Sequence, residues 1–99
     1  MLDISDLEAR FFMALGHPNR IKIVEVILKK GSRCNCELVT DTGFKQSNLS
    51  RHIKELINAG VLRFRREGNK VRYEIADKRI QKVIELVESI VKSNVFKIV

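Results

Sequence analysis

The sequence predicts one mainly α-helical domain with a small β-hairpin, in the order α-α-α-α-β-β-α. Apolar residues recur every three or four positions through most of the chain, which is the spacing of amphipathic helices. The segment 61–75 instead alternates apolar and polar residues around a Gly-Asn turn, as the two strands of a hairpin do. A length of 99 residues suits a single folded unit, so we treat 1–99 as one domain.

The first two helices are predicted from their start and stop signals. Ser5-Asp6-Leu7-Glu8 fits a capping box, so the first helix begins there or one turn earlier at Asp3, and it ends at Gly16. Pro18 suits the first turn of a second helix, because its missing N–H would have no partner in that turn. His17, which precedes this proline, is interpreted as a capping residue rather than a metal ligand.

A short third helix is predicted over 35–40, followed by a turn at 41–43 and a regular fourth helix over 46–59. On the fourth helix Leu49, Ile53 and Leu56 share one side. The opposite side is polar throughout and carries Ser47, Asn48, Arg51, Lys54, Glu55 and Asn58.

Two strands, 61–66 and 71–75, are predicted to form a two-stranded ribbon closed by the turn 67–70. Asp77 can cap a last helix that covers 77–99 and carries a long aliphatic stripe. Such a stripe exposes more apolar surface than a small monomer readily covers, so dimerisation is its expected use. The alternative is a helix folded back on its own domain.

The charge distribution favours a polyanionic partner. Nineteen Lys and Arg residues against twelve Asp and Glu residues give a net charge of +7. The excess lies in residues 42–75, which hold eight basic and three acidic residues. No apolar run is long enough to span a membrane and the first ten residues are not basic, so a cytoplasmic protein without a membrane partner is expected.

A short helix, a tight turn, a helix with a polar outer face and a basic hairpin follow one another in the order of a winged helix-turn-helix. The major groove of DNA admits one helix, whose N-terminal residues reach base edges, while a hairpin beside it can neutralise flanking phosphates. The residues expected to contact double-stranded DNA are Lys45, Gln46, Ser47, Asn48, Arg51, His52 and Lys54 from the helix and Arg63, Arg65, Arg66, Lys70 and Arg72 from the hairpin. For His52, which flanks the buried face, packing is the alternative role.

Two stretches carry a resemblance to a known family: FFMALGHPNRIKIVEVIL and SNLSRHIKELINAGVLRFRREGNKVRYEI. Together they resemble the ArsR/SmtB family of metal- and thiol-responsive transcriptional repressors, over residues 7 to about 91. The resemblance implies a homodimer joined through the first helix and the last helix, 77–99. It also implies a repressor whose two recognition helices bind an inverted-repeat operator.

The segment Cys34-Asn35-Cys36-Glu37-Leu38 resembles the start of the third helix in the arsenic-sensing branch of that family. The resemblance implies Cys34 and Cys36 as ligands for a thiophilic effector. Soft thiolates suit As(III), Sb(III), Cd(II), Zn(II) or Cu(I), and no other cofactor is required. Residues two apart on a regular helix point about 200° apart, so joint chelation is expected to need an unwound helix start. Thiol-redox sensing, or cysteines without a function, are the alternatives.

Several features expected at other kinds of site are missing from the sequence. The third cysteine of some arsenic sensors would fall at Val39, and the histidine of the zinc-sensing branch would fall at Arg79. No Gly-rich phosphate loop or nucleophile elbow occurs, so neither an enzyme nor a small-molecule substrate is expected. A winged helix used only for protein assembly would carry an acidic or apolar outer face on 46–59, which this chain does not.

Overall fold

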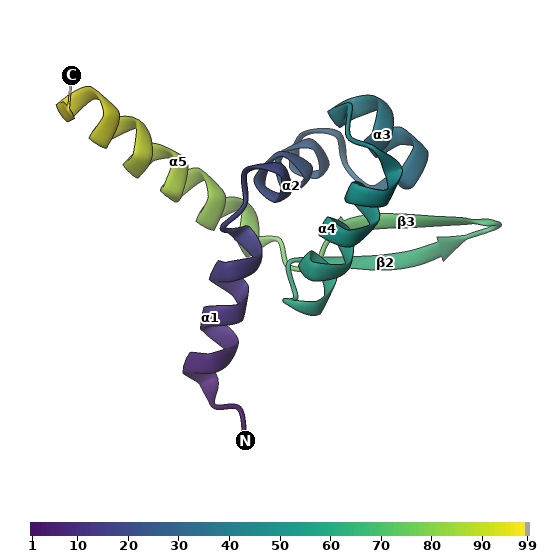
Figure 1. Ribbon diagram of the computed structural model, residues 1–99, viewed down its shortest axis with the longest axis horizontal. Coiled ribbons are helices and arrows are strands. Elements are labelled where there is room, and N and C mark those ends of the chain that lie inside the picture. Colours follow the sequence, from purple (N-terminus) through teal and green to yellow (C-terminus); the bar gives the residue numbers. More distant parts are fainter. Residues whose placement is uncertain (99) are drawn as a thin grey trace.

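The computed structural model describes residues 1–98, and in that range it contains five helices and a three-stranded sheet (Figure 1). The elements are α1 (Ile4–Leu15), α2 (Pro18–Lys30), β1 (Arg33–Cys34), α3 (Asn35–Thr42), α4 (Gln46–Asn58), β2 (Leu62–Glu67), β3 (Lys70–Ile75) and α5 (Arg79–Ile98). The predicted helices and hairpin are therefore all present in the predicted order.

Local side chains fix the starts of the first two helices. The carboxylate of Asp3 accepts the N–H of Asp6 at 3.0 Å, and the carboxylate of Asp6 accepts the N–H of Asp3 at 3.0 Å. The capping box therefore forms at the earlier of the two expected starts, and Ser5 lies inside the helix. Nδ1 of His17 accepts the N–H of Asn19 at 3.1 Å, so the predicted cap of α2 is confirmed.

The expectation of a two-stranded ribbon is wrong, because a third strand joins the hairpin. β1 pairs antiparallel with β3, with Arg33 opposite Tyr73 and Cys34 opposite Arg72. β3 also pairs with β2 along its whole length, so the strand order is β1-β3-β2. A two-residue strand shows no alternation, which is why the sequence pattern does not reveal it. The hairpin of β2 and β3 is called the wing below, and the pairing places Cys34 beside it as well as at the start of α3.

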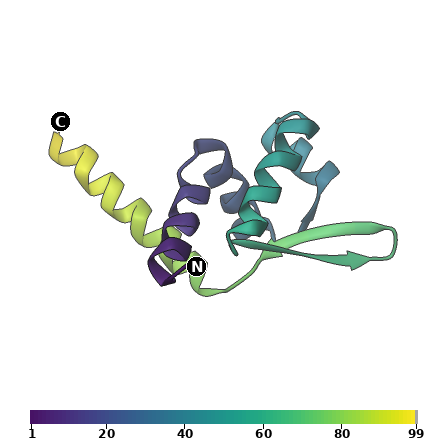
Figure 2. The same ribbon diagram turned by 60° about the horizontal axis from the view of Figure 1, so that its bottom comes forward.

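The core holds α4 in place between the other elements. Leu49, Ile53 and Leu56 of α4 are buried against residues of α2, α3 and the hairpin base, among them Ile23 and Leu62. Gly43, at a φ of 75°, supplies the left-handed end of α3 that the turn into α4 requires. The opposite face of α4 and the hairpin remain outside this core, and the hairpin projects from the body of the domain (Figure 2).

α5 starts in the core and then leaves the domain. Ile80 and Ile84 are buried, whereas the following apolar side chains on the helix are about half exposed. These exposed residues, the α5 stripe, are Leu86, Val87, Ile90, Val91 and Val95. Figures 1 and 2 both show α5 extending away from the other elements, on the side opposite the hairpin tip, so the helix does not fold back on its own domain. Among residues 1–98, no helix is both long and apolar enough for a membrane span.

Candidate DNA-binding surface and cysteine site

The outer face of α4 presents the polar residues expected to meet DNA. Every residue in this set is exposed, namely Lys45, Gln46, Ser47, Asn48, Arg51 and Lys54. Nη2 of Arg51 donates to Oδ1 of Asn48 at 3.3 Å, which holds the guanidinium over the outer face of the helix. Because the buried residues of α4 fix its rotation about its own axis, this face cannot turn inward without exposing the core.

His52 belongs to the core rather than to this face. Its side chain is 5% exposed, its Nδ1 accepts a hydrogen bond from Nε of Arg20 at 3.2 Å, and its ring centroid lies 4.6 Å from that of His17. Burial, reinforced by the neighbouring positive charges, lowers the pKa of His52 and keeps the ring neutral. The sequence placed His52 among the DNA contacts, and we withdraw it from that set because it packs α4 onto α2.

Two of the five basic hairpin residues are neutralised within one acidic cluster. Nη2 of Arg63 lies 2.8 Å from Glu74, and Nε of Arg65 lies 2.6 Å from the other oxygen of the same carboxylate. Arg65 also pairs with Glu67 at 2.8 Å. The hydrogen bonds from Arg63 and Arg65 lower the pKa of Glu74, so the cluster stays ionised at neutral pH.

Arg72 is also engaged inside the protein. Nη2 of Arg72 donates to the backbone oxygen of Ser32 at 2.8 Å, and Nε donates to Oγ of Ser32 at 3.1 Å. These bonds fasten β3 to the chain just before β1. Arg66 and Lys70 lie exposed near the hairpin tip, and within the described part of the chain neither forms an ion pair. The hairpin charges therefore divide into a braced group, Arg63, Arg65 and Arg72, and a free group, Arg66 and Lys70.

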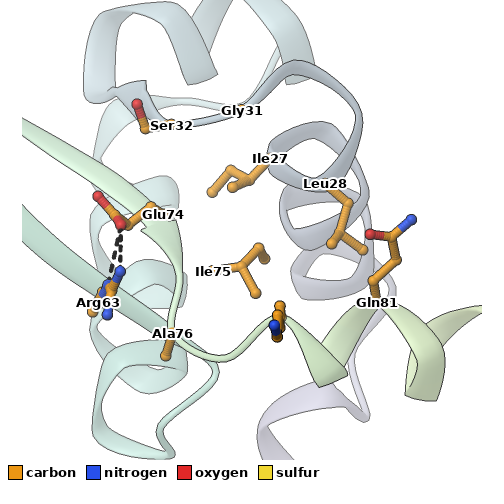
Figure 3. Close-up of a pocket in the computed structure, with 10 residues that line it drawn as sticks. Ile27, Leu28, Gly31, Ser32, Arg63, Glu74, Ile75, Ala76 and Gln81 are labelled. Carbon is orange, nitrogen blue, oxygen red and sulfur yellow. Dashed lines mark hydrogen bonds and ion pairs between the residues drawn. The ribbon is translucent and has the colours of Figure 1, made fainter.

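The braced pair Arg63 and Glu74 borders an open hollow of about 450 Å³ at the base of the hairpin. Figure 3 shows this hollow between α2 and the chain that leads into α5, with Ile27, Leu28 and Ile75 lining it. Its lining contains no cysteine or histidine, so it offers no soft metal ligand.

The two cysteines already lie together. The Sγ atoms of Cys34 and Cys36 are 3.0 Å apart. The expectation that their approach needs an unwound helix is wrong, because Cys34 is the extended cap residue before α3 (φ −84°, ψ 168°) and does not lie on the helix. Cys34 is buried and Cys36 is exposed. Their shared hydrogen bond lowers the pKa of Cys36 and raises the pKa of Cys34, and the charge of Lys70 lowers the pKa of Cys36 further.

Glu37 connects the cysteine pair to the wing. Its carboxylate accepts the N–H of Cys34 at 3.1 Å and lies 2.8 Å from Arg33 and 3.2 Å from Arg72. The Cys34 N–H lowers the pKa of Glu37, and both guanidinium groups lower it further. A single carboxylate thus contacts β1 and β3 from the first turn of α3. The contacts of Arg72 with Glu37 and with Ser32 could not be predicted from the sequence, because Arg72 is distant from both residues along the chain.

The cysteines and the DNA-facing helix share one hollow. An open hollow of about 390 Å³ is lined by Cys34, Asn35, Cys36, Gln46, Val71 and Tyr73. Gln46 is the first residue of α4, and Val71 and Tyr73 belong to β3. Within residues 1–98, no three His, Cys, Asp or Glu side chains are grouped so that they could hold a metal ion. The protein therefore offers two sulfur ligands here, beside residues of the helix and the wing.

The sequence is similar to those of known DNA-binding regulators. The model of the family described as "Bacterial regulatory protein, arsR family" matches residues 17–63. The probable mercury resistance operon repressor of Streptomyces lividans is 36% identical over 89 residues, which cover 90% of this chain and 70% of that protein.

Solved structures show the same fold over nearly the whole chain. The crystal structure of Rv0081 from Mycobacterium tuberculosis matches with a TM-score of 0.86 at 33% identity, over 98% of this chain and 97% of that one. The solution structure of the homodimeric winged helix-turn-helix DNA-binding domain of Mb0332 from Mycobacterium bovis matches with a TM-score of 0.84 at 27% identity, over 90% of this chain and 82% of that one. The protein is a winged helix-turn-helix, and it belongs to the arsR family of DNA-binding transcriptional repressors, which are not enzymes.

Proposed function

We propose that this repressor leaves its operator when a thiophilic metalloid or metal, foremost As(III), binds Cys34 and Cys36. The observation that carries the proposal is the 3.0 Å separation of the two Sγ atoms in a hollow that Gln46 also lines. Two thiols at this distance can bind one soft centre without rearrangement of the backbone. The lowered pKa of Cys36 raises its thiolate fraction, which favours ligand exchange. The mercury-resistance relative bears the name of another thiophilic element.

The neighbours of the cysteines suggest how binding releases DNA. An atom held by both sulfurs occupies the hollow against Gln46 of α4 and against Val71 and Tyr73 of β3. It also shifts the cap of α3, where Glu37 links Cys34 to Arg72 of the wing. A ligand on the two sulfurs would therefore act on both DNA-facing elements, α4 and the hairpin. Because DNA binding requires one relative position of helix and wing, a ligand that favours another position lowers operator affinity.

The proposed DNA contacts are the exposed residues of α4 and the free group of the wing. Gln46, Asn48 and Arg51 are proposed to read base edges, and Lys45 and Lys54 to contact phosphates. Arg66 and Lys70 are proposed to hold flanking phosphates. A homodimer through α1 and the α5 stripe, which the homodimeric relative supports, binds an inverted repeat with half-sites about 10 bp apart or a small multiple of that.

The test is fluorescence anisotropy of the reduced protein on DNA from its own promoter. As(III), Sb(III), Hg(II), Cd(II) and Zn(II) are titrated into the preformed complex, and the expected result is release by As(III) and Sb(III). The double substitution Cys34→Ser and Cys36→Ser should keep DNA binding and abolish release. Thr40→Ser, at an exposed residue of α3, is the matched control, because serine keeps the hydroxyl that donates to the backbone oxygen of Cys36. Binding that none of the five ions weakens contradicts the proposal.

Thiol oxidation is a second candidate, which the same sulfur separation favours. Peroxide would oxidise both thiols to one disulfide and be reduced to water, with two hydrogen atoms lost from the protein. A disulfide between residues two apart closes a small strained ring and is readily reduced. Mass spectrometry after peroxide treatment, with operator affinity measured before and after thiol reduction, separates this candidate from metalloid binding.

A further inference from the structure

We infer that Glu37 couples the cysteine pair to the wing, so that a thiophilic ligand on the two sulfurs weakens operator binding largely through this carboxylate. The inference rests on the proposed function, because it concerns the effect of the same ligand. It makes Glu37 a positioning residue, which contacts neither the ligand nor DNA and acts through the residues that it holds.

The observation is that one oxygen of Glu37 serves both the cysteine segment and the wing. Oε1 of Glu37 accepts the N–H of Cys34 at 3.1 Å, and the same oxygen lies 3.2 Å from Nη2 of Arg72 on β3. The other oxygen, Oε2, accepts a hydrogen bond from Nη1 of Arg33 at 2.8 Å. A ligand that displaces Cys34 therefore either moves the oxygen beside Arg72 or breaks one of its two contacts. In both cases the surroundings of Arg72 change.

The contacts of Arg72 continue from β3 to β2. Arg72 donates to the backbone oxygen of Ser32 at 2.8 Å and to its Oγ at 3.1 Å. Nη2 of Arg65, on β2, lies 3.5 Å from the same Oγ. The side chain of Arg72 is only 19% exposed, so water screens its charge less than at a fully exposed position. A change at Glu37 thus reaches both strands of the wing through charged side chains.

Two other routes lead away from the cysteines. β1 pairs with β3, with Cys34 opposite Arg72, and Gln46 of α4 lines the cysteine hollow. The pairing extends over only two residues of β1. Among residues 1–98, no side-chain hydrogen bond or ion pair joins Cys34, Cys36 or Glu37 to α4. We therefore assign most of the coupling to the carboxylate, and the experiment must separate it from the strand pairing and the hollow.

The substitution Glu37→Gln isolates the contact with the wing. Glutamine at the third position of a helix can still accept the N–H of the cap residue, so the start of α3 is kept. The substitution removes the charge, which weakens the contacts with Arg33 and Arg72. The side chain of Glu37 is 36% exposed, which favours a folded variant. Glu25→Gln, at an exposed residue of α2, is the matched control, because it changes the net charge by the same amount.

The experiment measures the operator affinity of the reduced full-length protein by fluorescence anisotropy, with and without saturating As(III). Calorimetry gives the As(III) affinity of each DNA-free protein. In the wild type and in Glu25→Gln, As(III) should weaken operator binding by a factor of about 5–150, the usual range of allosteric coupling. Glu37→Gln should reduce this factor about fivefold. It should leave the As(III) affinity of the DNA-free protein within about twofold, because both sulfur ligands remain.

Two further measurements test whether the coupling passes through Arg72 to the wing. Arg72→Gln weakens the same contact from the other side, so combining it with Glu37→Gln should reduce the factor no further than the stronger single substitution. The amide resonances of Gly68 and Asn69 report on the hairpin tip without DNA. As(III) should shift them in the wild type and much less in Glu37→Gln.

The contrary outcomes are distinct. An unchanged factor in Glu37→Gln overturns the role of Glu37 and assigns the coupling to the strand pairing or the hollow. A loss of As(III) affinity that accounts for the loss of release also overturns it, because Glu37 would then act on ligand binding. Both outcomes leave the proposed function intact, whereas a wild-type protein that As(III) does not release from the operator overturns the proposed function and this inference with it. If circular dichroism shows that Glu37→Gln is unfolded, Arg72→Gln decides the result by the same two affinities.

Discussion

Nε of Arg20 donates a hydrogen bond to Nδ1 of His52 over 3.2 Å, and this bond joins α2 to the DNA-facing helix α4. Nδ1 can accept only while it carries no proton. The ring of His17 lies against His52, and its own Nδ1 accepts the N–H that caps α2. Arg51 adds a further positive charge on α4. The contact between α2 and α4 is therefore built for a neutral His52.

The first prediction concerns pH. The pKa of His52 is lowered in the folded protein, so the unfolded chain binds more protons below a pH of about 6.5. The contribution of His52 to the free energy of unfolding should be constant above that pH. It should fall as the pH drops below it, by at most about 1.4 kcal/mol per pH unit. Urea unfolding at pH 7.5, 6.5 and 5.5 measures the effect.

The control for this prediction is His52→Gln, whose amide oxygen can still accept from Arg20 and does not titrate. Its free energy of unfolding should depend less steeply on pH than that of the wild type between pH 7.5 and 5.5. Equal slopes for the two proteins would show that His52 does not contribute to the acid sensitivity.

Much of the fold could be predicted from the sequence, because periodic patterns of apolar residues indicate its helices and strands. The apolar spacing that indicated α4 matches its buried residues Leu49, Ile53 and Leu56. β2 and β3 lie where the sequence 61–75 alternates, although their residues after Leu62 are exposed or half-buried. β1 could not be predicted in this way, since two residues show no period and the strand forms only because β3 offers it an edge. Helix starts were ambiguous by one turn where two capping patterns overlapped.

Less of the candidate site could be predicted, because side-chain partners distant in sequence decide it. The composition of the hairpin indicated a basic surface, yet Glu74 and Ser32 engage three of its five arginine and lysine residues. The Cys-x-Cys pattern identified the cysteines but not their separation, because Cys34 precedes the helix.

The second prediction separates the two groups of hairpin charges. Arg66 is free and Arg65 is held by Glu74 and Glu67, although the two are neighbours on β2. Arg66→Ala should reduce the salt dependence of binding to random duplex DNA by about one phosphate. Arg65→Ala should reduce it less, since part of the charge of Arg65 is already compensated. Anisotropy titrations at salt concentrations from about 50 to about 200 mM give the salt dependence of binding for each variant.

An equal change of slope for Arg65→Ala and Arg66→Ala would contradict this division, because it would mean that Arg65 leaves its carboxylates to meet DNA. The substitution Glu74→Gln then serves as a further check. It weakens the ion pairs of both Arg63 and Arg65, so binding to random DNA should tighten if those pairs restrain the two arginines.

The third prediction concerns base recognition by α4. Arg51→Ala should weaken binding to the operator by roughly 1–3 kcal/mol, the value of one good base contact, and should weaken random-DNA binding much less. Lys54→Ala is the comparison, since a phosphate contact should be lost about equally on both DNAs. Competition anisotropy with operator and random duplexes at one salt concentration distinguishes the two. Equal losses for Arg51→Ala would reassign it to a phosphate contact.

The last prediction concerns the dimer. Val91 is 52% exposed in the protomer and lies in the α5 stripe, so a partner helix must cover it for the stripe to leave water. Val91→Asp places a charge where a homodimer buries apolar side chains, and it should shift the protein to monomers in sedimentation at micromolar concentration. Operator affinity should fall far more than random-DNA affinity, because one protomer reaches one half-site. Ser89→Asp, an exposed position on the opposite side of α5, should remain dimeric. A dimeric Val91→Asp protein would show that the stripe is not the interface.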